Sequence, residues 1–306
     1  MNPIMAGKVV IVTGAGRGIG RAAALDLAAN GASVVVNDIG GSLQGEGRDA
    51  SPAEAVVDEI RQAGGQAVAN TASVAEPQAA ATIVDSALAA FGRIDAVVNN
   101  AGILRDAIFH RMTSADFDAV MRVHLFGSYY MSCAAALHFK RQGSGALVHM
   151  TSTAGLIGSM GQANYAAAKL AIAGLSRTIA LELAAFGIRS NCIAPGAFSR
   201  MIESIPNSSP EEQAAYMAKR AATMRPEQVA PLITYLASEE AVDVTGQIFG
   251  VRGNEIFLYS QPRPFRSMER EDGWTPEALA EELLPAWQAS LVPAERTRNV
   301  FAWDPI

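Results

Sequence analysis

The side chains best suited to chemistry in this sequence are a tyrosine, Tyr165, and the lysine four residues after it, Lys169. Both belong to an alanine-rich stretch, residues 164–186, whose small and apolar residues predict a buried helix. Side chains four residues apart lie on one face of a helix, so we expect the phenol and the ammonium group side by side. Such a pair can take up and release a proton.

The charge of Lys169 is expected to make Tyr165 more acidic. A tyrosine ordinarily ionises near pH 10, too high for a base that works at neutral pH. Two unit charges about 4 Å apart interact by roughly 4 kcal/mol at an effective dielectric near 20, and one pKa unit corresponds to about 1.4 kcal/mol. We therefore expect the lysine alone to lower the pKa of Tyr165 by about two to three units, with a bound cationic nicotinamide acting in the same direction. The alternative is a surface tyrosine near a solvated lysine.

Composition and charge exclude several classes of protein. The chain has 306 residues, half of them hydrophobic, which is enough for one domain, or one domain with an appendage. A net charge of −6 argues against a nucleic-acid partner. Cys133 and Cys192 form neither a metal spacing nor a disulfide framework, which favours a reducing compartment. His110, His138 and His149 show no metal spacing either, so we expect no metal.

The first residues carry no signal-peptide pattern, and no apolar stretch is long enough to cross a membrane. We therefore expect a cytoplasmic protein without a membrane partner.

A strand, a glycine-rich turn and a helix open the chain. Residues 8–13 are an apolar run typical of a buried strand, and residues 21–30 have helical spacing. A turn between them lets backbone N–H groups and the helix dipole meet a pyrophosphate, and glycines let the phosphates approach. A tight turn without a ligand is the alternative. The residues expected to bind the cofactor here are Gly14, Arg17, Gly18, Ile19 and Gly20.

The second strand, residues 32–38, ends on a carboxylate, Asp38. Its distance from Gly20 is close to the spacing at which an acid holds the adenosine ribose hydroxyls. A carboxylate there repels the additional phosphate of NADP, so the expected cofactor is NAD. Arg17 is the contrary sign, because a guanidinium can pair with that phosphate. A polar loop, residues 40–51, is expected to cover the adenine end.

Helices and strands alternate along the rest of the chain, which predicts an α/β fold with a parallel sheet covered by helices on both faces. The strand count reaches seven. Helices are expected at residues 53–63, 78–91 and 114–140, and further strands at 66–70, 94–99, 146–151, 188–193 and 247–251.

Several motifs together resemble the short-chain dehydrogenase/reductase family. They are Thr13 with Gly14, Gly18 and Gly20, then Asn99 to Gly102, Ser152 thirteen residues before Tyr165, Lys169, and Pro195 with Gly196. The resemblance covers roughly residues 6 to 252. It implies a Rossmann-type, doubly wound seven-stranded parallel sheet in three layers over residues 1–252, a nicotinamide cofactor and a homodimer or homotetramer. Further cofactor contacts that it implies are Ser73, Val74, Asn100, Ala101, Gly102, Pro195 and Gly196.

Other stretches, such as Asn100 to Asp106, Gly161 to Tyr165 and Trp274 to Ala278, resemble the (3R)-hydroxyacyl-CoA dehydrogenase unit of peroxisomal multifunctional enzyme type 2. This implies oxidation of a secondary alcohol on an acyl-CoA or a steroid. The chain departs from the wider family at His124, where many members have asparagine. It also has Ala72 where an acidic residue often binds the adenine amino group, which leaves Ser73 as a substitute.

The resemblance assigns roles in the reaction. Tyr165 takes the hydroxyl proton of the substrate, Ser152 orients the oxygen, and Lys169 keeps the phenol acidic and holds the nicotinamide ribose. His124 connects Lys169 to solvent through a water. Alternatively, His124 is a core histidine with one backbone hydrogen bond.

Two segments remain for substrate and assembly. Residues 198–225 carry methionine and aliphatic side chains that suit a movable cover over a large apolar substrate, or else a plain connecting helix. Residues 253–306 are expected to form an extension that packs on the core or on a neighbouring subunit. Thr275 predicts the start of a helix over residues 276–287. Arg263, Arg266 and Arg270 precede it and could meet coenzyme A phosphates, form surface salt bridges or contact another subunit.

Three functions follow for comparison. The first is an NAD-dependent dehydrogenase of 3-hydroxyacyl-CoA substrates, including those with a steroid or other bulky acyl part. The second is a dehydrogenase of free steroid or terpenoid alcohols. The third is a non-catalytic, redox-sensing NAD-binding protein, which the presence of Ser152, Tyr165 and Lys169 disfavours.

Overall fold

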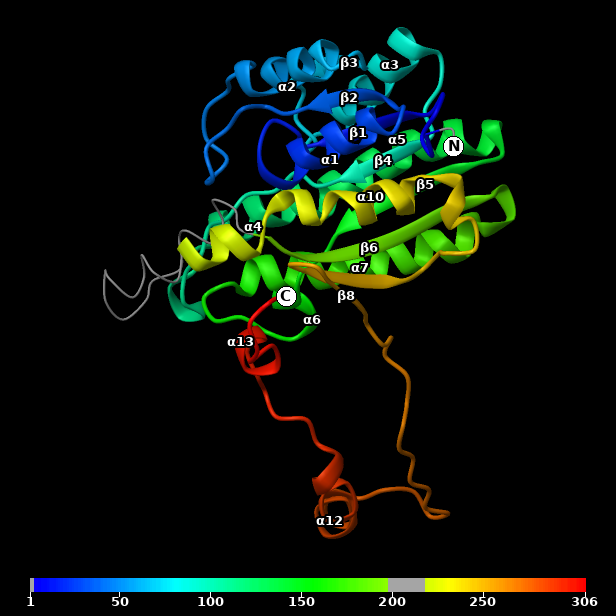
Figure 1. Ribbon diagram of the computed structural model, residues 1–306. Helices are drawn as coiled ribbons and strands as arrows, with labels where there is room; N and C mark the ends of the chain where they lie inside the picture. The colour runs from blue at the N-terminus through cyan, green and yellow to red at the C-terminus, as the bar shows by residue number, and fades with distance from the viewer. Residues whose placement is uncertain (1–2, 198–217) are drawn as a thin grey trace.

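The computed structural model describes residues 3–197 and 218–306 and contains one eight-stranded sheet between two layers of helices (Figure 1). The strand order is β3-β2-β1-β4-β5-β6-β7-β8. Seven strands are parallel, as predicted, and an eighth, β8, is antiparallel to β7. The strands are β1 (Val9–Thr13), β2 (Ser33–Asn37), β3 (Gln66–Asn70), β4 (Ala96–Asn99), β5 (Gly145–Met150), β6 (Ile188–Gly196), β7 (Ile248–Arg252) and β8 (Glu255–Leu258).

The central strands are apolar on both faces because helices cover both sides of the sheet. In β1, Val10 and Val12 pack in one core cluster, and Val9 and Ile11 in the other. One face is covered by α1 (Gly18–Ala29), α2 (Ser51–Gln62) and α10 (Ala230–Ala237). The other is covered by α3 (Pro77–Phe91), α5 (Gly127–Gln142) and α7 (Ala163–Leu183).

The helix expected over residues 114–140 is interrupted. It consists of α4 (Ser114–Met121), a π-helical segment (Arg122–Phe126) and α5. A π-helical turn inserts an extra residue into a helix and frequently occurs at functional sites. Here the segment contains His124.

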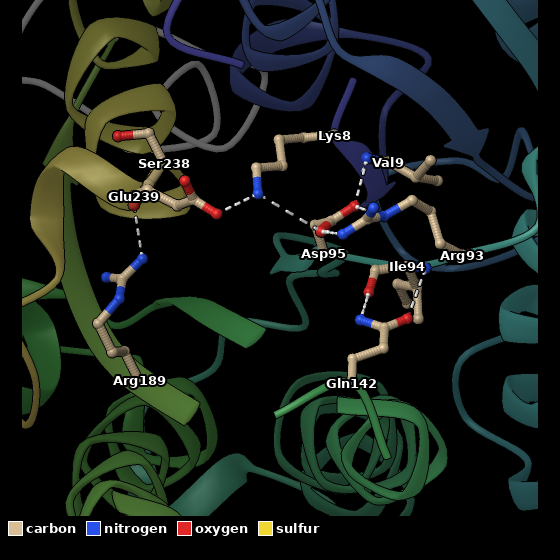
Figure 2. Close-up of polar contacts among 9 residues, drawn as sticks. All are labelled: Lys8, Val9, Arg93, Ile94, Asp95, Gln142, Arg189, Ser238 and Glu239. Atoms are coloured by element: carbon tan, nitrogen blue, oxygen red, sulfur yellow. Dashed lines mark hydrogen bonds and ion pairs between the residues drawn. The ribbon is translucent and has the colours of Figure 1, made fainter. Parts of the chain in front are cut away.

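The amino ends of the strands are tied together by a buried carboxylate, Asp95 (Figure 2). Asp95 accepts a hydrogen bond from the Val9 N–H at 2.9 Å and two from the Arg93 guanidinium at 2.6 and 2.9 Å. Lys8 lies between Asp95 and Glu239 and pairs with both. This network fixes β1 against β4 at their amino ends, whereas the glycine-rich turn follows the carboxyl end of β1.

Short helices complete the described residues. They are α6 (Thr153–Leu156), α11 (Pro276–Ala278), α12 (Leu284–Trp287) and α13 (Thr297–Val300), a π-helical segment (Leu279–Leu283), and 3₁₀ turns at Phe109–Arg111, Ala184–Phe186, Pro226–Gln228, Glu239–Ala241 and Gln288–Ser290. Among all residues that the structure describes, no helix is long and apolar enough to cross a membrane. The substrate segment expected at 198–225 lies outside the described residues up to residue 217.

The extension after residue 252 begins with β8, so the expected boundary falls in the turn between β7 and β8. The chain then runs away from the body, forms the helical run 276–287, and returns through α13 (Figure 1). The predicted N-cap is confirmed, because the Thr275 hydroxyl accepts a hydrogen bond from the Ala278 N–H at 3.2 Å.

Candidate active site

The site lies at the carboxyl ends of β1 and β4, which a buried threonine, Thr13, holds together. Its hydroxyl donates to the Val98 carbonyl at 3.2 Å and accepts from the N–H groups of Asn100 and Ala101 at 3.0 and 3.1 Å. The Asn100 amide donates back to the Thr13 and Gly14 carbonyls at 2.9 and 3.1 Å. Ligands of open α/β sheets bind at such a crevice between neighbouring strands.

The glycines of the turn after β1 serve two different needs. A Cβ on Gly20 would lie 2.1 Å from the Gly14 carbonyl oxygen, and one on Gly14 would lie 2.8 Å from the Ala101 Cα, so both residues allow close packing. Gly18 has a positive φ of 53°, and a Cβ there would meet nothing within 4 Å. The space in front of Gly18, at the start of α1, is therefore open, and a helix N-terminus of this kind can bind phosphates.

Asp38 follows β2 and lines the same space. Its carboxylate accepts hydrogen bonds from the Gly16 N–H at 2.8 Å and the Gly40 N–H at 2.7 Å. Each carboxylate oxygen can accept more than one hydrogen bond. Asp38 can therefore fix the glycine turn and still accept from ribose hydroxyls.

A cavity of about 480 Å³ joins these residues to the proton-transfer residues. This volume is within the range of ligand and cofactor pockets. The predicted site residues that line it are Gly14, Arg17, Gly18, Ile19, Asp38, Ser73, Val74, Asn100, Ala101, Gly102, His124, Tyr165, Lys169 and Pro195. Ser152, Gly20 and Gly196 are outside this lining. Gly196 packs closely against β7, since a Cβ there would lie 3.0 Å from the Val251 carbonyl oxygen.

Ser152 and Tyr165 come from elements that follow one another in the chain, and their side chains form a hydrogen bond. Ser152 follows β5 as the N-cap of α6, where its hydroxyl accepts from the Ala154 N–H at 3.1 Å. Tyr165 lies in the first turn of α7, whose start is held by Asn164, which donates to the Arg105 carbonyl at 2.9 Å. A hydrogen bond from Ser152 lowers the pKa of Tyr165, against a larger opposing effect of burial.

The predicted lowering of the Tyr165 pKa is wrong, because the pKa is raised instead. Burial raises the pKa of Tyr165 to about 12, and it lowers the pKa of Lys169 to about 7. The Lys169 amine lies 5.5 Å from the centroid of the Tyr165 ring and donates to the Met150 carbonyl at 2.6 Å. Desolvation outweighs the attraction on which the sequence estimate relied, because it disfavours both charged forms.

His124 packs edge-on against Tyr165, with the ring centroids 5.2 Å apart. Its Nε2 lies 3.1 Å from the Ile103 nitrogen and 2.8 Å from the Ile103 oxygen, so the expected backbone contact is present. Its Nδ1 is buried and has no hydrogen-bond partner among the described residues. Gly102 leaves room for the ring, since a Cβ there would lie 2.3 Å from the His124 Cε1. Burial lowers the pKa of His124 to about 3, so the imidazole is neutral.

Several lining residues were not predicted as site residues. Their signal in the sequence is weak, because arginines and small apolar residues in loops have many other uses. They include Ile103, Arg105, Arg122 and Thr151, whereas Ser42, Leu43 and Gly45 belong to the polar loop 40–51 that was expected at the adenine end.

The arginines of the extension do not line this cavity. Arg270 forms an ion pair with Glu282, and Arg266 donates to the Ser290 hydroxyl at 3.2 Å. Arg263 donates to the Pro262 carbonyl at 2.7 Å. Of these three contacts, that of Arg270 is a surface salt bridge. Within residues 3–197 and 218–306, no cluster of three or more His, Cys, Asp or Glu could hold a metal ion.

Comparison with known proteins places this site in a family. Peroxisomal multifunctional enzyme type 2 of Mus musculus is 45% identical over 275 residues, which cover 89% of this chain but 36% of the mouse protein. The hydroxyacyl-CoA dehydrogenase ChsB1 of Mycobacterium tuberculosis is 38% identical over 292 residues, covering 91% of this chain and 88% of that protein.

Solved structures agree. A short chain dehydrogenase from Mycobacterium avium superimposes with a TM-score of 0.82 at 39% identity and covers 96% of this chain and 98% of its own. A 7α-hydroxysteroid dehydrogenase, complexed with NADH and 7-oxo glycochenodeoxycholic acid, has a TM-score of 0.73 at 34% identity and covers 82% of this chain and 96% of its own. The family pattern described as short chain dehydrogenase matches residues 8–207. The chain therefore belongs to the short chain dehydrogenase family and is an oxidoreductase that acts on CH–OH groups.

Proposed function

We propose that this protein oxidises the secondary alcohol of a 3-hydroxyacyl-CoA with NAD. The observation that carries the proposal is the single cavity that connects Asp38 and the glycine turn with Tyr165 and Lys169. Relatives named as a hydroxyacyl-CoA dehydrogenase and a peroxisomal multifunctional enzyme support the substrate class. Asp38 supports NAD over NADP, because its carboxylate repels a phosphate on the ribose.

The proposed reaction uses Tyr165 as the base. A bound nicotinamide supplies the acceptor for the hydride that leaves the alcohol carbon. The substrate hydroxyl proton passes to the Tyr165 oxygen, while the Ser152 hydroxyl orients the substrate oxygen. Burial keeps the Tyr165 phenol protonated in the ligand-free protein, so it becomes a base only when positive charge is close to it. Lys169, whose pKa of about 7 leaves it partly protonated at neutral pH, provides one such charge.

His124 is proposed to support this step through a water between Lys169 and solvent. Its unpartnered Nδ1 at the cavity can accept a hydrogen bond from such a water. The contact of Nε2 with Ile103 fixes the orientation of the ring.

A dehydrogenase of free steroid alcohols is the second candidate, favoured by the bile-acid derivative in the similar 7α-hydroxysteroid dehydrogenase. To separate the two, reduced-nicotinamide absorbance is followed with NAD or NADP, across 3-hydroxyacyl-CoA esters and free steroid alcohols. We expect turnover of the thioesters with NAD. Turnover of free steroids alone would favour the second candidate, preference for NADP would overturn the role of Asp38, and NADH binding without turnover of either class would indicate a sensor.

Tyr165→Phe provides the catalytic control. We expect it to lower kcat by at least a hundredfold, the usual contribution of a general base, while NADH still binds. Tyr235→Phe is the matched control, since Tyr235 lies on α10, whose residues Leu232, Ile233 and Leu236 pack in the core cluster on the α1 and α2 side of the sheet. Equal activity of Tyr165→Phe and the wild type would disprove the mechanism.

Assembly and location are proposed on separate grounds. Helices α5 and α7 expose Tyr129, Leu137, Leu170 and Leu181, which favours a homodimer or homotetramer that buries them. The cytoplasm is the proposed location, and the name of the mouse relative makes the peroxisome the alternative to test.

A further inference from the structure

The loop after β2 has a tip, residues 42–46, that is closed on itself. The Gly45 N–H donates to the Ser42 carbonyl at 3.0 Å, and the Ser42 N–H donates to the Glu46 carbonyl at 2.7 Å. At the base of the loop, the Asp49 N–H donates to the Ile39 carbonyl at 3.0 Å. These bonds give the tip a defined shape rather than that of an extended linker.

This tip holds the segment that follows β4, residues 103–105. The Leu104 N–H donates to the Leu43 carbonyl at 3.0 Å, and Arg105 Nε donates to the Gln44 carbonyl at 3.1 Å. Gly45, with a φ of +85°, packs so closely that a Cβ there would lie 3.1 Å from the Ile103 Cγ2. The two segments are therefore joined by a backbone bond, a side-chain bond and an apolar contact.

The position of this contact in the sheet gives it a function. Strand β1 lies between β2 and β4, so a loop from β2 that reaches the segment after β4 must pass over the end of β1. The glycine turn starts at that end. Leu43 and Gly45 on one side, and Ile103 and Arg105 on the other, line the same cavity as Gly14 and Gly18. A dinucleotide on the glycine turn would lie beneath this bridge.

Both ends of the bridge are anchored to the site. On the β2 side, the Asp38 carboxylate accepts from the Gly40 N–H at 2.7 Å. On the β4 side, the Arg105 carbonyl accepts from Asn164 at 2.9 Å, one residue before Tyr165. Loss of the bridge would therefore leave both anchors in place and open only the cover.

We propose that Arg105 and residues 42–46 form a clasp that retains the dinucleotide. The clasp rests on the proposed function in one respect, namely that a dinucleotide binds in this cavity. Arg105 is a positioning residue in it, because it acts through the Gln44 carbonyl. Release of the dinucleotide requires the Arg105 to Gln44 and Leu104 to Leu43 bonds to open.

The test measures how fast NADH leaves the protein, by stopped-flow fluorescence after displacement with excess NAD. Arg105→Ala removes the clasp bond, and Gly45→Ala pushes the tip away from Ile103. Arg105→Ala should speed release about tenfold, the effect expected for the loss of one hydrogen bond from a charged donor. Gly45→Ala should also speed release, because its φ of +85° and the 3.1 Å approach to Ile103 both oppose a side chain there. The double variant should be little faster than either single variant, since both changes open the same contact. Clearly additive effects would contradict a single clasp.

Asp116→Asn is the matched control. It weakens the other contact of the Arg105 guanidinium, at 3.4 Å from the Asp116 carboxylate, and leaves the clasp bond intact. We expect release within twofold of the wild type. If Asp116→Asn released NADH as fast as Arg105→Ala does, Arg105 would act through its contact with α4, and the clasp would be overturned.

Hydrogen exchange gives a reading without activity or ligand. The Leu104 amide should be protected in the wild type and exchange at least several times faster in Arg105→Ala, with an unchanged melting temperature. Equal NADH release and equal Leu104 exchange in all variants would disprove the clasp while the proposed function stands. If the wild type did not bind NADH, the proposed function would be overturned, and the clasp would have no dinucleotide to retain.

Discussion

At the scale of single residues, burial determines the resting protonation of the site. Tyr165 and Lys169 both have pKa values shifted toward their neutral forms, to about 12 and about 7, because desolvation disfavours charge. The sequence supplied the two residues and their spacing. It predicted a buried helix but not how strongly these two side chains are desolvated, which depends on how α7 packs against β5 and β6. This is why the direction of the Tyr165 shift could not be obtained from residue types.

Two buried imidazoles lead to a prediction about acid stability. His149 is fully buried on β5, where its Nδ1 lies 3.2 Å from the Asn99 amide nitrogen, and its pKa is lowered to about 4 by burial. The unfolded chain binds a proton at His149 below about pH 6.5, whereas the folded chain does so only near pH 4. The unfolded state therefore binds more protons in this window, so stability falls as pH decreases. From pH 7 to pH 5 the loss should be about 2 kcal/mol for His149.

His124 should contribute a similar loss, because its pKa is lowered to about 3. We expect His149→Leu to remove about half of the combined decline in the free energy of unfolding, measured by urea denaturation at pH 7, 6 and 5. His138→Gln is the control, because His138 is only partly buried and its hydrogen bond with Arg141 is exposed. The same pH dependence in the wild type and in His149→Leu would contradict this account.

At the scale of the elements, most boundaries could be predicted from the sequence. Continuous apolar runs identify β1, β2 and β5, because strands buried on both faces lack alternation. The eighth strand was missed because its four residues alternate in exposure and follow a two-residue turn. The π-helical segment was missed because an inserted residue leaves the helical pattern nearly intact on either side.

The close approach of the first turn of α1 to Gly14 leads to a second prediction. Gly20→Ala places a methyl group 2.1 Å from the Gly14 carbonyl oxygen, with backbone on both sides of the contact. We expect a loss of stability of about 2 kcal/mol or more, comparable to overpacking of a core, together with weaker NADH binding. Thermal unfolding and NADH titration measure the two effects.

Gly174→Ala is the matched control for this change, since it makes the same substitution in another helix. A Cβ on Gly174 meets nothing within 4 Å. It should stabilise the protein by about 0.5–1 kcal/mol through the lower entropy of the unfolded chain. If Gly20→Ala were as stable as Gly174→Ala, the close approach of α1 to the turn would be disproved.

At the scale of the whole molecule, the last residues of the chain pack against the outer strand of the sheet, β8. Phe301 and Trp303 form an aromatic cluster with Phe257 of β8, with ring centroids 5.2 to 6.3 Å apart. The Arg252 guanidinium lies 5.7 Å from the Phe301 ring and 5.3 Å from the Trp303 ring. The sequence predicted an extension with a helix, but its return to the core depends on these long-range contacts, which leave no local pattern.

The returning segment contacts the loop between Ser152 and Tyr165, the proposed catalytic residues. The N–H and the hydroxyl of Thr297 both donate to the Gly158 carbonyl, at 3.1 and 3.3 Å. Gly158 lies between Ser152 and Tyr165 in the chain. Asp304 pairs with Lys219 at 2.8 Å, on the segment that follows residues 198–217. The tail, residues 297–306, thus contacts both the loop between Ser152 and Tyr165 and the described end of the expected substrate segment.

We therefore expect Trp303→Ala to release the tail and loosen the loop at Gly158. The KM for the alcohol substrate should rise several-fold with a smaller change in kcat, because substrate positioning is lost while Tyr165 and Lys169 remain in α7. NADH release should be unchanged, since no tail residue lines the dinucleotide cavity. Val292→Ala, at an 82% exposed side chain of the outer part of the extension, is the control. An unchanged KM in Trp303→Ala, with Gly158 exchange equal to that of the wild type, would show that the tail stabilises the fold without positioning the substrate.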